Sequence, residues 1–205
     1  VPEDLALALS ARSPLWIAGS THPTEEEFVL DALRKLHIRH PELHLMIAPR
    51  HPGRFDEVER IIKASGYSCI RRSQIPFPNE PNPNQVLLLD SIGELAAAYA
   101  YATVVFMGGT LAPAGGHNIL EPARFAKPIV IGPHMENFRE IRDLFTNNHA
   151  VFPVAEPNVL YAAVGIYLIK EEFARERGEA AQKLVNDNAG VVDRMVSILT
   201  RWEPA

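Results

Sequence analysis

Short, wholly apolar runs alternate along this chain with segments of helical periodicity, and this alternation constrains the fold more than any other feature. The strand candidates are residues 15–18, 43–48, 68–71, 86–90, 103–107, 128–131 and 150–154. Several of these runs are apolar throughout rather than at every second position, which is typical of strands buried on both faces of a parallel sheet. With right-handed crossovers, the pattern predicts an α/β fold with a doubly wound, mostly parallel, Rossmann-like sheet.

The segments between these strands carry helix signals of their own. Thr24 and Glu27 have the spacing of a capping box ahead of a helix whose apolar residues recur as far as Leu36. A second helix is predicted for residues 54–65 and ends at Gly66. Further helices are expected at 93–102, at 136–147 and, two or three in number, at the C-terminal end. The Pro- and Asn-rich stretch 75–85 predicts an exposed loop.

Composition limits the class of protein. The 205 residues suit one domain, and a hydrophobic content of 47% is enough for a full core. The net charge of -5, with no basic stripe, argues against nucleic acid as a main partner. The single cysteine, Cys69, excludes an internal disulfide. No apolar run approaches the ~20 residues of a membrane span and no secretory signal is recognisable, so we expect a soluble, untargeted chain. Because it starts without Met, it is expected to be a fragment or a processed product.

The stretch from Val104 to Asn137 is the main functional signal. It carries the sequence Gly108-Gly109 directly after a strand and Gly115-Gly116-His117-Asn118 at an expected helix start. Glycines at the carboxyl end of a strand let a ligand approach the backbone, and a helix N-terminus attracts an anion. The segment therefore predicts a nucleotide or phosphate ligand, although each glycine pair could also be a simple turn. The dinucleotide fingerprint G-x-G-x-x-G is absent, so a redox dinucleotide has no specific support.

Other candidate ligand contacts follow the remaining strands. Arg50, after Pro49 at the end of a strand, can bind a phosphate with its guanidinium fork or be an ordinary surface residue. Glu121 is either the capping-box partner of Asn118 or an acceptor for a ribose diol. Glu94 either complements a helix dipole or helps to hold a nucleotide. The hydroxyls and backbone of Ser20, Thr21 and His22 follow the first strand, where they can meet an anion.

Metal and hydrolase signatures are lacking. His37, His40 and His44 have only loosely ligand-like spacing, and they are predicted to be surface residues rather than a metal site. There is no Asp-x-Asp pair to hold a divalent cation for a sugar nucleotide, no G-x-S-x-G elbow and no P-loop.

Several of these motifs together resemble a known family. They are Gly19-Ser20-Thr21-His22, Pro49-Arg50-His51-Pro52, Gly93-Glu94-Leu95, Gly108-Gly109, GGHN-x-LEP at 115–122 and GPH-x-x-NF at 132–138. In this order and spacing they resemble the bacterial Kdo transferases (3-deoxy-D-manno-octulosonic acid transferases), over nearly the whole chain. Those enzymes are GT-B glycosyltransferases with two Rossmann-like domains. The resemblance implies that residues 1–205 are the C-terminal donor-binding domain and that the N-terminal acceptor domain is absent.

The resemblance also implies the chemistry. The donor would be CMP-Kdo, the acceptor a lipid A precursor, and the location the cytoplasmic side of the bacterial inner membrane. The implied nucleotide contacts are Pro49, Arg50, Ile92, Gly93, Glu94, Gly108, Gly109, Gly115, Gly116, His117, Asn118, Ile119, Leu120 and Glu121, with Ser20, Thr21 and His22 on the donor side. No metal cofactor is expected. The catalytic glutamate base and the acceptor and membrane surfaces would belong to the absent domain, so this chain alone is expected to be inactive.

Two other interpretations remain open at this point. The chain could be a nucleotide-binding module without catalysis. It could also be a GT-B domain for a different sugar nucleotide, such as that of a UDP-sugar transferase or an epimerase.

Overall fold

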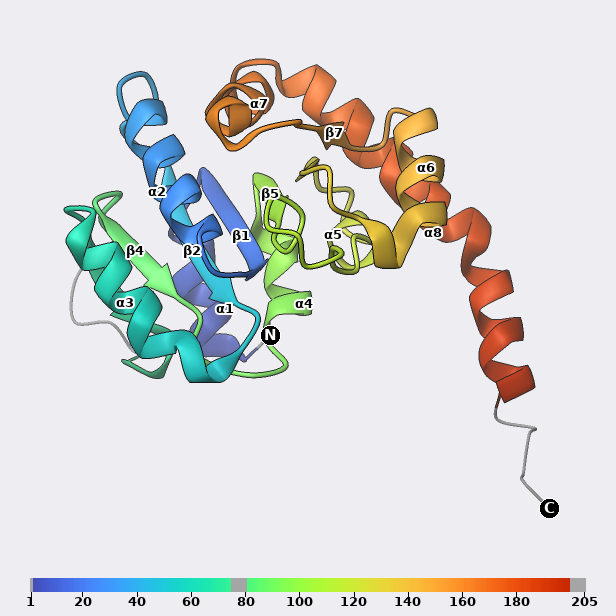
Figure 1. Ribbon diagram of the computed structural model, residues 1–205, viewed down its shortest axis with the longest axis horizontal. Helices are drawn as coiled ribbons and strands as arrows, with labels where there is room; N and C mark the ends of the chain where they lie inside the picture. Colours follow the sequence, from blue (N-terminus) through green and yellow to red (C-terminus); the bar gives the residue numbers. More distant parts are fainter. Residues whose placement is uncertain (1, 75–80, 200–205) are drawn as a thin grey trace.

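Seven parallel strands form a single sheet at the centre of the molecule (Figure 1). The structure, a computed structural model, describes residues 2–74 and 81–199, with side chains as far as residue 188. In chain order the strands are β1 (Leu15–Thr21), β2 (His44–Pro49), β3 (Ser68–Arg71), β4 (Gln85–Leu88), β5 (Val104–Met107), β6 (Ile129–Ile131) and β7 (Phe152–Pro153). Their order across the sheet is β3-β4-β2-β1-β5-β6-β7. The predicted parallel, Rossmann-like fold is confirmed.

Helices cover both faces of the sheet, which is why its strands are apolar throughout. Helices α2 (Glu25–Leu36), α3 (Phe55–Ala64) and α7 (Leu160–Ile169) share one core cluster with Trp16 and Ala18 of β1. The opposite cluster contains Leu15 and Ile17 of β1. It is covered by α1 (Glu3–Ser10), α4 (Leu95–Ala98), α5 (Leu120–Ala123), α6 (Arg139–Asn147) and α8 (Glu171–Leu199). Successive strand residues therefore alternate between two cores instead of between core and water.

Several element boundaries differ from the sequence prediction. Helix α1 was not predicted. The helix expected at 93–102 is the short α4 followed by a 3₁₀ turn, Tyr99–Tyr101. The helix expected at 136–147 begins with a 3₁₀ turn, Glu136–Phe138, before α6. Of the predicted loop 75–85, residues 75–80 lie outside the described residues.

The capping box predicted for α2 is wrong. Thr24 does precede the helix, but its backbone is left-handed (φ 79°) and its side chain makes no capping hydrogen bond. A threonine in this region of φ is uncommon, because its branched side chain crowds the backbone. The residue that organises this turn is instead its neighbour, Glu25.

Glu25 is fully buried and accepts hydrogen bonds from five backbone N–H groups. Oε2 accepts from His22 (2.9 Å) and from Gly109 (2.7 Å). Oε1 accepts from three successive residues after β5, namely Thr110 (3.1 Å), Leu111 (2.9 Å) and Ala112 (3.0 Å). A buried carboxylate is costly unless its charge is compensated, and here the loop after β5 folds around it to supply the donors. Glu25 thus joins the chain leaving β1 to the chain leaving β5.

Glu26, also fully buried, joins β1 to the start of α3. Arg54 forms a two-pronged ion pair with its carboxylate (2.7 and 3.1 Å), and the Thr21 hydroxyl donates to Oε1 (2.7 Å). Burial opposes the charge on Arg54. Its hydrogen bonds to Glu26 and Glu57 outweigh that effect and hold the pKa of the guanidinium above its usual value.

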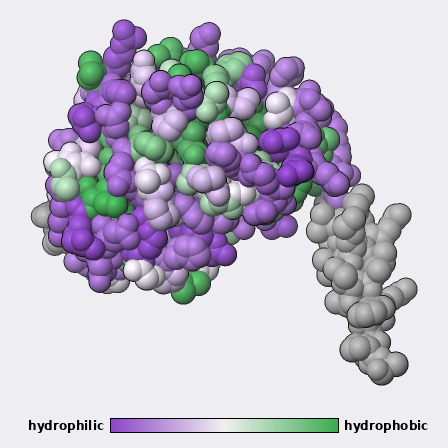
Figure 2. Space-filling model, in the orientation of Figure 1, coloured by the Kyte–Doolittle hydropathy of each residue, from purple (hydrophilic) through white to green (hydrophobic). Residues whose placement is uncertain are grey.

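None of the helices in the described part of the chain combines the length and apolarity needed to cross a bilayer. The face drawn in Figure 2 is mostly hydrophilic, with hydrophobic residues scattered over it.

We expect Glu25→Gln to lower the free energy of unfolding by at least about 3 kcal/mol. The amide has one acceptor oxygen and places an NH₂ group against N–H donors, so buried donors lose their partner and the remaining bonds lose charge assistance. Urea denaturation measures the loss. Glu27→Gln is the matched control on the same helix, where the side chain is exposed, and it should stay within about 0.5 kcal/mol of the parent. Equal effects of the two substitutions would contradict the structural role of Glu25.

Candidate functional site

A pocket of about 370 Å³ opens at the carboxyl edge of the sheet. Its lining residues lie at the ends of four neighbouring strands, β2, β1, β5 and β6, or in the chain that follows them: Ser20, Arg50, Met107, His117, Asn118, Glu121 and Phe138. Parallel α/β sheets bind ligands at this edge, because all the loops that leave the strands meet there. Five of the seven residues, Ser20, Arg50, His117, Asn118 and Glu121, were predicted from the sequence as ligand contacts.

Arg50 supplies a cation to the pocket. It directly follows Pro49, the last residue of β2, and its backbone N–H donates to the Thr21 carbonyl of the neighbouring strand (3.0 Å). Its side chain is exposed, and it forms no ion pair with any residue that the structure describes. A guanidinium held at a pocket without a carboxylate partner is suited to an anionic ligand.

Asn118 and Glu121 lie on another side of the same pocket. The Asn118 side-chain oxygen accepts from the N–H of Leu120 (3.1 Å), the first residue of α5, but the residue directly before the helix is Ile119, which has no side-chain cap. Burial raises the pKa of Glu121, while its hydrogen bond with Asn118 and the nearby Arg124 and Arg50 act in the opposite direction. Polar atoms that can accept hydrogen bonds from hydroxyls therefore share the pocket with a cation.

His117 forms a hydrogen bond with His22 across the pocket wall, with a distance of 2.8 Å between the two Nε2 atoms. The two rings are nearly parallel, with their centroids 5.0 Å apart. The rings of His51 and His22 meet edge to face, with their centroids 5.5 Å apart. Burial, together with His22, Arg50 and His51, lowers the pKa of His117 to about 4. The predicted donor-side residue His22 thus reaches the pocket through His117, while Thr21 is turned toward Glu26.

The glycines do not act as the sequence predicted. Gly115-Gly116-His117-Asn118 does not open a long helix, since the helix that follows is the four-residue α5. The N–H of Gly109 is not free for a phosphate, because it donates to Glu25. The N–H groups of Gly108 and Gly116 likewise donate to the carbonyls of Gly19 and Gly109, so three of the predicted backbone donors are already used within the protein.

Close packing explains the glycines instead. A Cβ on Gly108 would lie 2.4 Å from the Ser20 carbonyl oxygen, and one on Gly109 2.9 Å from the His117 ring. At Gly115 (φ 84°) it would lie 2.3 Å from the Asn137 side chain, and at Gly116 (φ 79°) 2.5 Å from the sulfur of Met135. The GGHN segment thus packs directly against the GPH-x-x-NF segment, and this contact shapes the pocket.

The predicted contacts Ile92, Gly93 and Glu94 lie outside the residues that line the pocket. They follow β4, which pairs with β2, so they leave the same edge of the sheet beside Arg50. Glu94 is paired with Arg72 (2.9 Å) and bonded to the Ser91 hydroxyl, and these bonds outweigh burial and lower its pKa. Ile92 is 81% exposed. Ile119 is fully buried in the core, and Leu120 packs against the same core, so both side chains stabilise the fold.

Three features of the site were missed in the sequence. Met107 and Phe138 line the pocket, but apolar residues at the end of a strand and in a turn carry no distinguishing signal. Tyr99 is fully buried, with a hydroxyl that has no hydrogen-bond partner among the described residues. It lies against Gly19, where a Cβ would come 2.0 Å from that hydroxyl oxygen. The glycine in the Gly-Ser-Thr-His motif therefore makes room for Tyr99.

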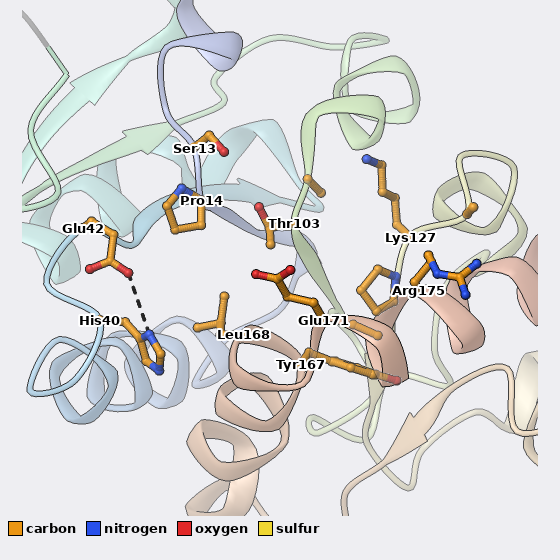
Figure 3. Close-up of a pocket in the computed structure, with 14 residues that line it drawn as sticks. Ser13, Pro14, His40, Glu42, Thr103, Lys127, Tyr167, Leu168, Glu171 and Arg175 are labelled. Atoms are coloured by element: carbon orange, nitrogen blue, oxygen red, sulfur yellow. Dashed lines mark ion pairs between the residues drawn. The ribbon is translucent and has the colours of Figure 1, made fainter.

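A second pocket, of about 480 Å³, lies at the opposite, amino edge of the sheet. Ser13 and Pro14 before β1, Thr103 before β5 and Lys127 before β6 line it, together with Glu171 of α8 (Figure 3). It faces away from the loops that carry the sequence motifs.

Of the three histidines that were weighed as metal ligands, two have partners of their own. His37 bonds the Leu43 carbonyl (2.9 Å), His40 faces Glu42 (3.7 Å), and His44 is buried in β2. His37 and His40 are partly exposed, but the expectation of a surface position is wrong for His44. Within the described residues no group of three or more His, Cys, Asp or Glu side chains is arranged to hold a metal ion.

Comparison with known proteins decides the family. No family model matches the chain. A 3-deoxy-D-manno-octulosonic acid transferase of Haemophilus influenzae is 38% identical over 187 residues, which are 91% of this chain and 43% of that protein. The crystal structure of the C-terminal CMP-Kdo binding domain of WaaA from Acinetobacter baumannii is 34% identical, with a TM-score of 0.80, over 88% of this chain and 93% of that one. The chain belongs to the 3-deoxy-D-manno-octulosonic acid transferase family.

Membership of this family agrees with the fold. Anabaena HepE, solved in complex with UDP and glucose, has the same fold with a TM-score of 0.67 over 98% of this chain, at 16% identity. The sheet is that of a GT-B glycosyltransferase domain, as the sequence predicted. The chain spans less than half the length of the Haemophilus family member.

Proposed function

We propose that the pocket at the carboxyl edge binds the CMP part of CMP-Kdo, and that residues 1–205 are the donor-binding domain of a Kdo transferase. The observation that carries this proposal is the meeting of Arg50, without an ion-pair partner among the described residues, with Asn118 and Glu121 in one pocket. A nucleoside monophosphate has an anionic phosphate and a neutral ribose diol, which match these two kinds of group. The name of the Acinetobacter relative, a CMP-Kdo binding domain, supports cytidine as the nucleoside.

Each part of the pocket has a role in this proposal. Arg50 binds the phosphate, Glu121 and Asn118 accept hydrogen bonds from the ribose hydroxyls, and Ser20 contacts the donor from β1. Ile92, Gly93 and Glu94 complete the nucleotide site at its rim beside Pro49 and β2. The glycines at 108, 109, 115 and 116 contribute by shaping the pocket, while Ile119 and Leu120 hold the segment against the core.

The reaction of the whole protein is part of the same proposal. A hydroxyl of a lipid A precursor attacks the anomeric carbon of Kdo, the bond to the phosphate oxygen breaks, and CMP leaves. The base that takes the hydroxyl proton is a glutamate of the N-terminal domain, which these residues do not include. This chain contributes donor binding and stabilisation of the leaving phosphate, mainly through Arg50. The transfer needs no metal cofactor. The whole protein acts at the cytoplasmic side of the bacterial inner membrane.

We expect Arg50→Ala to weaken CMP binding by about 10- to 100-fold, because a charge-assisted phosphate contact contributes roughly 1.5–3 kcal/mol. Isothermal titration calorimetry measures the change, with UMP, UDP and NAD as competing nucleotides. Arg39→Ala, an exposed arginine after the C-terminal end of α2, is the matched control and should leave binding unchanged. Unchanged CMP affinity in Arg50→Ala would remove Arg50 from the site. A preference for UDP would favour a different sugar nucleotide.

Glu121→Gln separates diol recognition from helix capping. Glutamine also serves in a capping box, so the melting temperature should change little. Loss of the charged acceptor should lower CMP affinity by about tenfold or more. Glu140→Gln, at an exposed position of α6, is the control. A fall in melting temperature with unchanged affinity would assign Glu121 to capping alone.

The isolated chain should transfer no Kdo. A positioned base typically contributes about 10²–10⁴-fold to such a reaction, and loss of acceptor positioning removes a further large factor. Incubation with CMP-Kdo and lipid A precursor, followed by mass spectrometry, checks this expectation, and a version of the protein with its N-terminal domain is the positive control. Turnover by the isolated chain would mean that the base lies within these residues.

A further inference from the structure

The side chains of His22 and His117 form a hydrogen-bonded pair to which the proposed nucleotide site assigns no role. His22 follows β1 and His117 lies in the segment after β5, so two neighbouring strands bring them together. Their Nε2 atoms are 2.8 Å apart. We call these two residues the His22–His117 pair.

One proton occupies the space between the two Nε2 atoms. A hydrogen bond between two ring nitrogens needs one N–H donor and one bare acceptor, so one imidazole is protonated at Nε2 and the other is not. In the neutral pair, the ring that donates has a bare Nδ1, and the ring that accepts has an Nδ1–H. The pair can therefore take one further proton at the bare Nδ1 without breaking its own hydrogen bond. It would then be a monocation with two Nδ1–H groups.

The surroundings keep the empty pair neutral near pH 7. Burial is the largest cause that lowers the pKa of both rings. His51 opposes a charge on both rings, Arg50 opposes one on His117, and Arg54 opposes one on His22. Glu25 and Glu26 favour a charge on His22. Both carboxylates already bind other partners, namely the backbone donors and Arg54, so their effect does not prevail.

The pair is also held in place by the protein. The backbone N–H of His22 donates to Glu25 (2.9 Å). Gly109 (φ 68°) leaves the space that the rings occupy, since a Cβ there would lie 2.9 Å from Cδ2 of His117 and 3.3 Å from Cδ2 of His22. Rings fixed in this way beside a pocket offer a ligand a preorganised partner.

We propose that the His22–His117 pair is a second anion subsite of the pocket, and that it takes up a proton when an anionic group of the ligand binds beside Arg50. The inference rests on the proposed function for the ligand, a phosphate-bearing nucleotide. His117 lines the pocket and its Nε2 is committed to His22, so its Nδ1 is the ring nitrogen left for the ligand. A bound anion offsets the repulsion from Arg50 and His51, and this raises the pKa of the pair.

The affinity of this subsite for an anion depends on pH. Proton uptake on binding occurs only between the pKa of the empty pair and the higher pKa of the occupied pair. In this interval anion affinity falls as pH rises, because the protonated form is lost. At pH 7.5 the phosphate of CMP is already mostly a dianion, since its second pKa is about 6, so a proton taken up there comes to the protein.

Calorimetric titration of CMP at pH 7.5 in buffers of different ionisation enthalpy measures this uptake. We expect a net uptake of a fraction of a proton, up to about one, per CMP bound. His117→Gln and His22→Gln should abolish the uptake and weaken binding by about tenfold. His40→Gln, at the amino edge, should change neither quantity. Binding of CMP without proton uptake would overturn the His22–His117 proposal and leave the proposed function standing.

Histidine ring NMR titrations with and without inorganic phosphate provide the second measurement. We expect phosphate to raise the pKa of His117 or His22 to about 7 or higher, because only then is part of the pair protonated at pH 7.5. If CMP does not bind at all, the proposed function fails, and this titration still decides the subsite. The absence of a shift at saturating phosphate would overturn the proposal even if the substituted proteins fail to fold.

Discussion

The carboxylate of Glu25 is the constraint on which the site depends. It lies at the first residue of α2, and through five backbone N–H groups it holds the chain after β1 against the chain after β5. Thr110, within that second segment, accepts in turn from the N–H groups of Gly132 (2.8 Å) and His134 (2.9 Å) after β6. Three loops at the carboxyl edge are thus connected by one buried charge and by the hydroxyl and backbone carbonyl of one threonine. Buried charge of this kind is tolerated only when fully hydrogen-bonded, which makes the loop geometry specific.

This arrangement limits the groups with which the pocket could bind the proposed anionic ligand. In many parallel α/β proteins the backbone N–H groups after a strand bind the phosphate of the ligand. Here Glu25 occupies the donors of residues 109–112, so the chain supplies its own anion at that position. Recognition of a ligand anion must then rely on side chains, and Arg50 and His117 are the cationic or protonatable groups that line the pocket.

The sequence predicted the sheet and most of the pocket, because both follow from local pattern and general topology. Wholly apolar runs require burial on two faces, and parallel strands bring the residues after them to one edge. Ser20 and Arg50 were expected at this edge for that reason, and Glu121 because it lies one turn into the helix predicted after the glycine motif. Helix starts and glycine roles were predicted less well, because distant contacts decide them. Gly115 is required because the Asn137 side chain packs against it. Thr24 has a left-handed backbone next to Glu25, whose side chain binds the backbone of residues 109–112. Helix α1, with its sequence EDLALALS, is short, and its alternating apolar residues suit a strand as well as a helix.

Local compensation of charge, rather than the net charge, explains why an anion would be drawn to this edge. The chain carries −5 overall. Around the pocket, however, three carboxylates have dedicated partners: Glu26 is paired with Arg54, Glu94 with Arg72, and Glu25 with backbone donors. Each of these negative charges is offset within a few ångströms, whereas Arg50 has no such partner among the described residues. The residual potential at the pocket is therefore set by Arg50, by the protonation of its histidine neighbours and by Glu121, whose charged form is disfavoured by burial. At distances beyond a Debye length of about 8 Å the exposed acidic residues elsewhere contribute little.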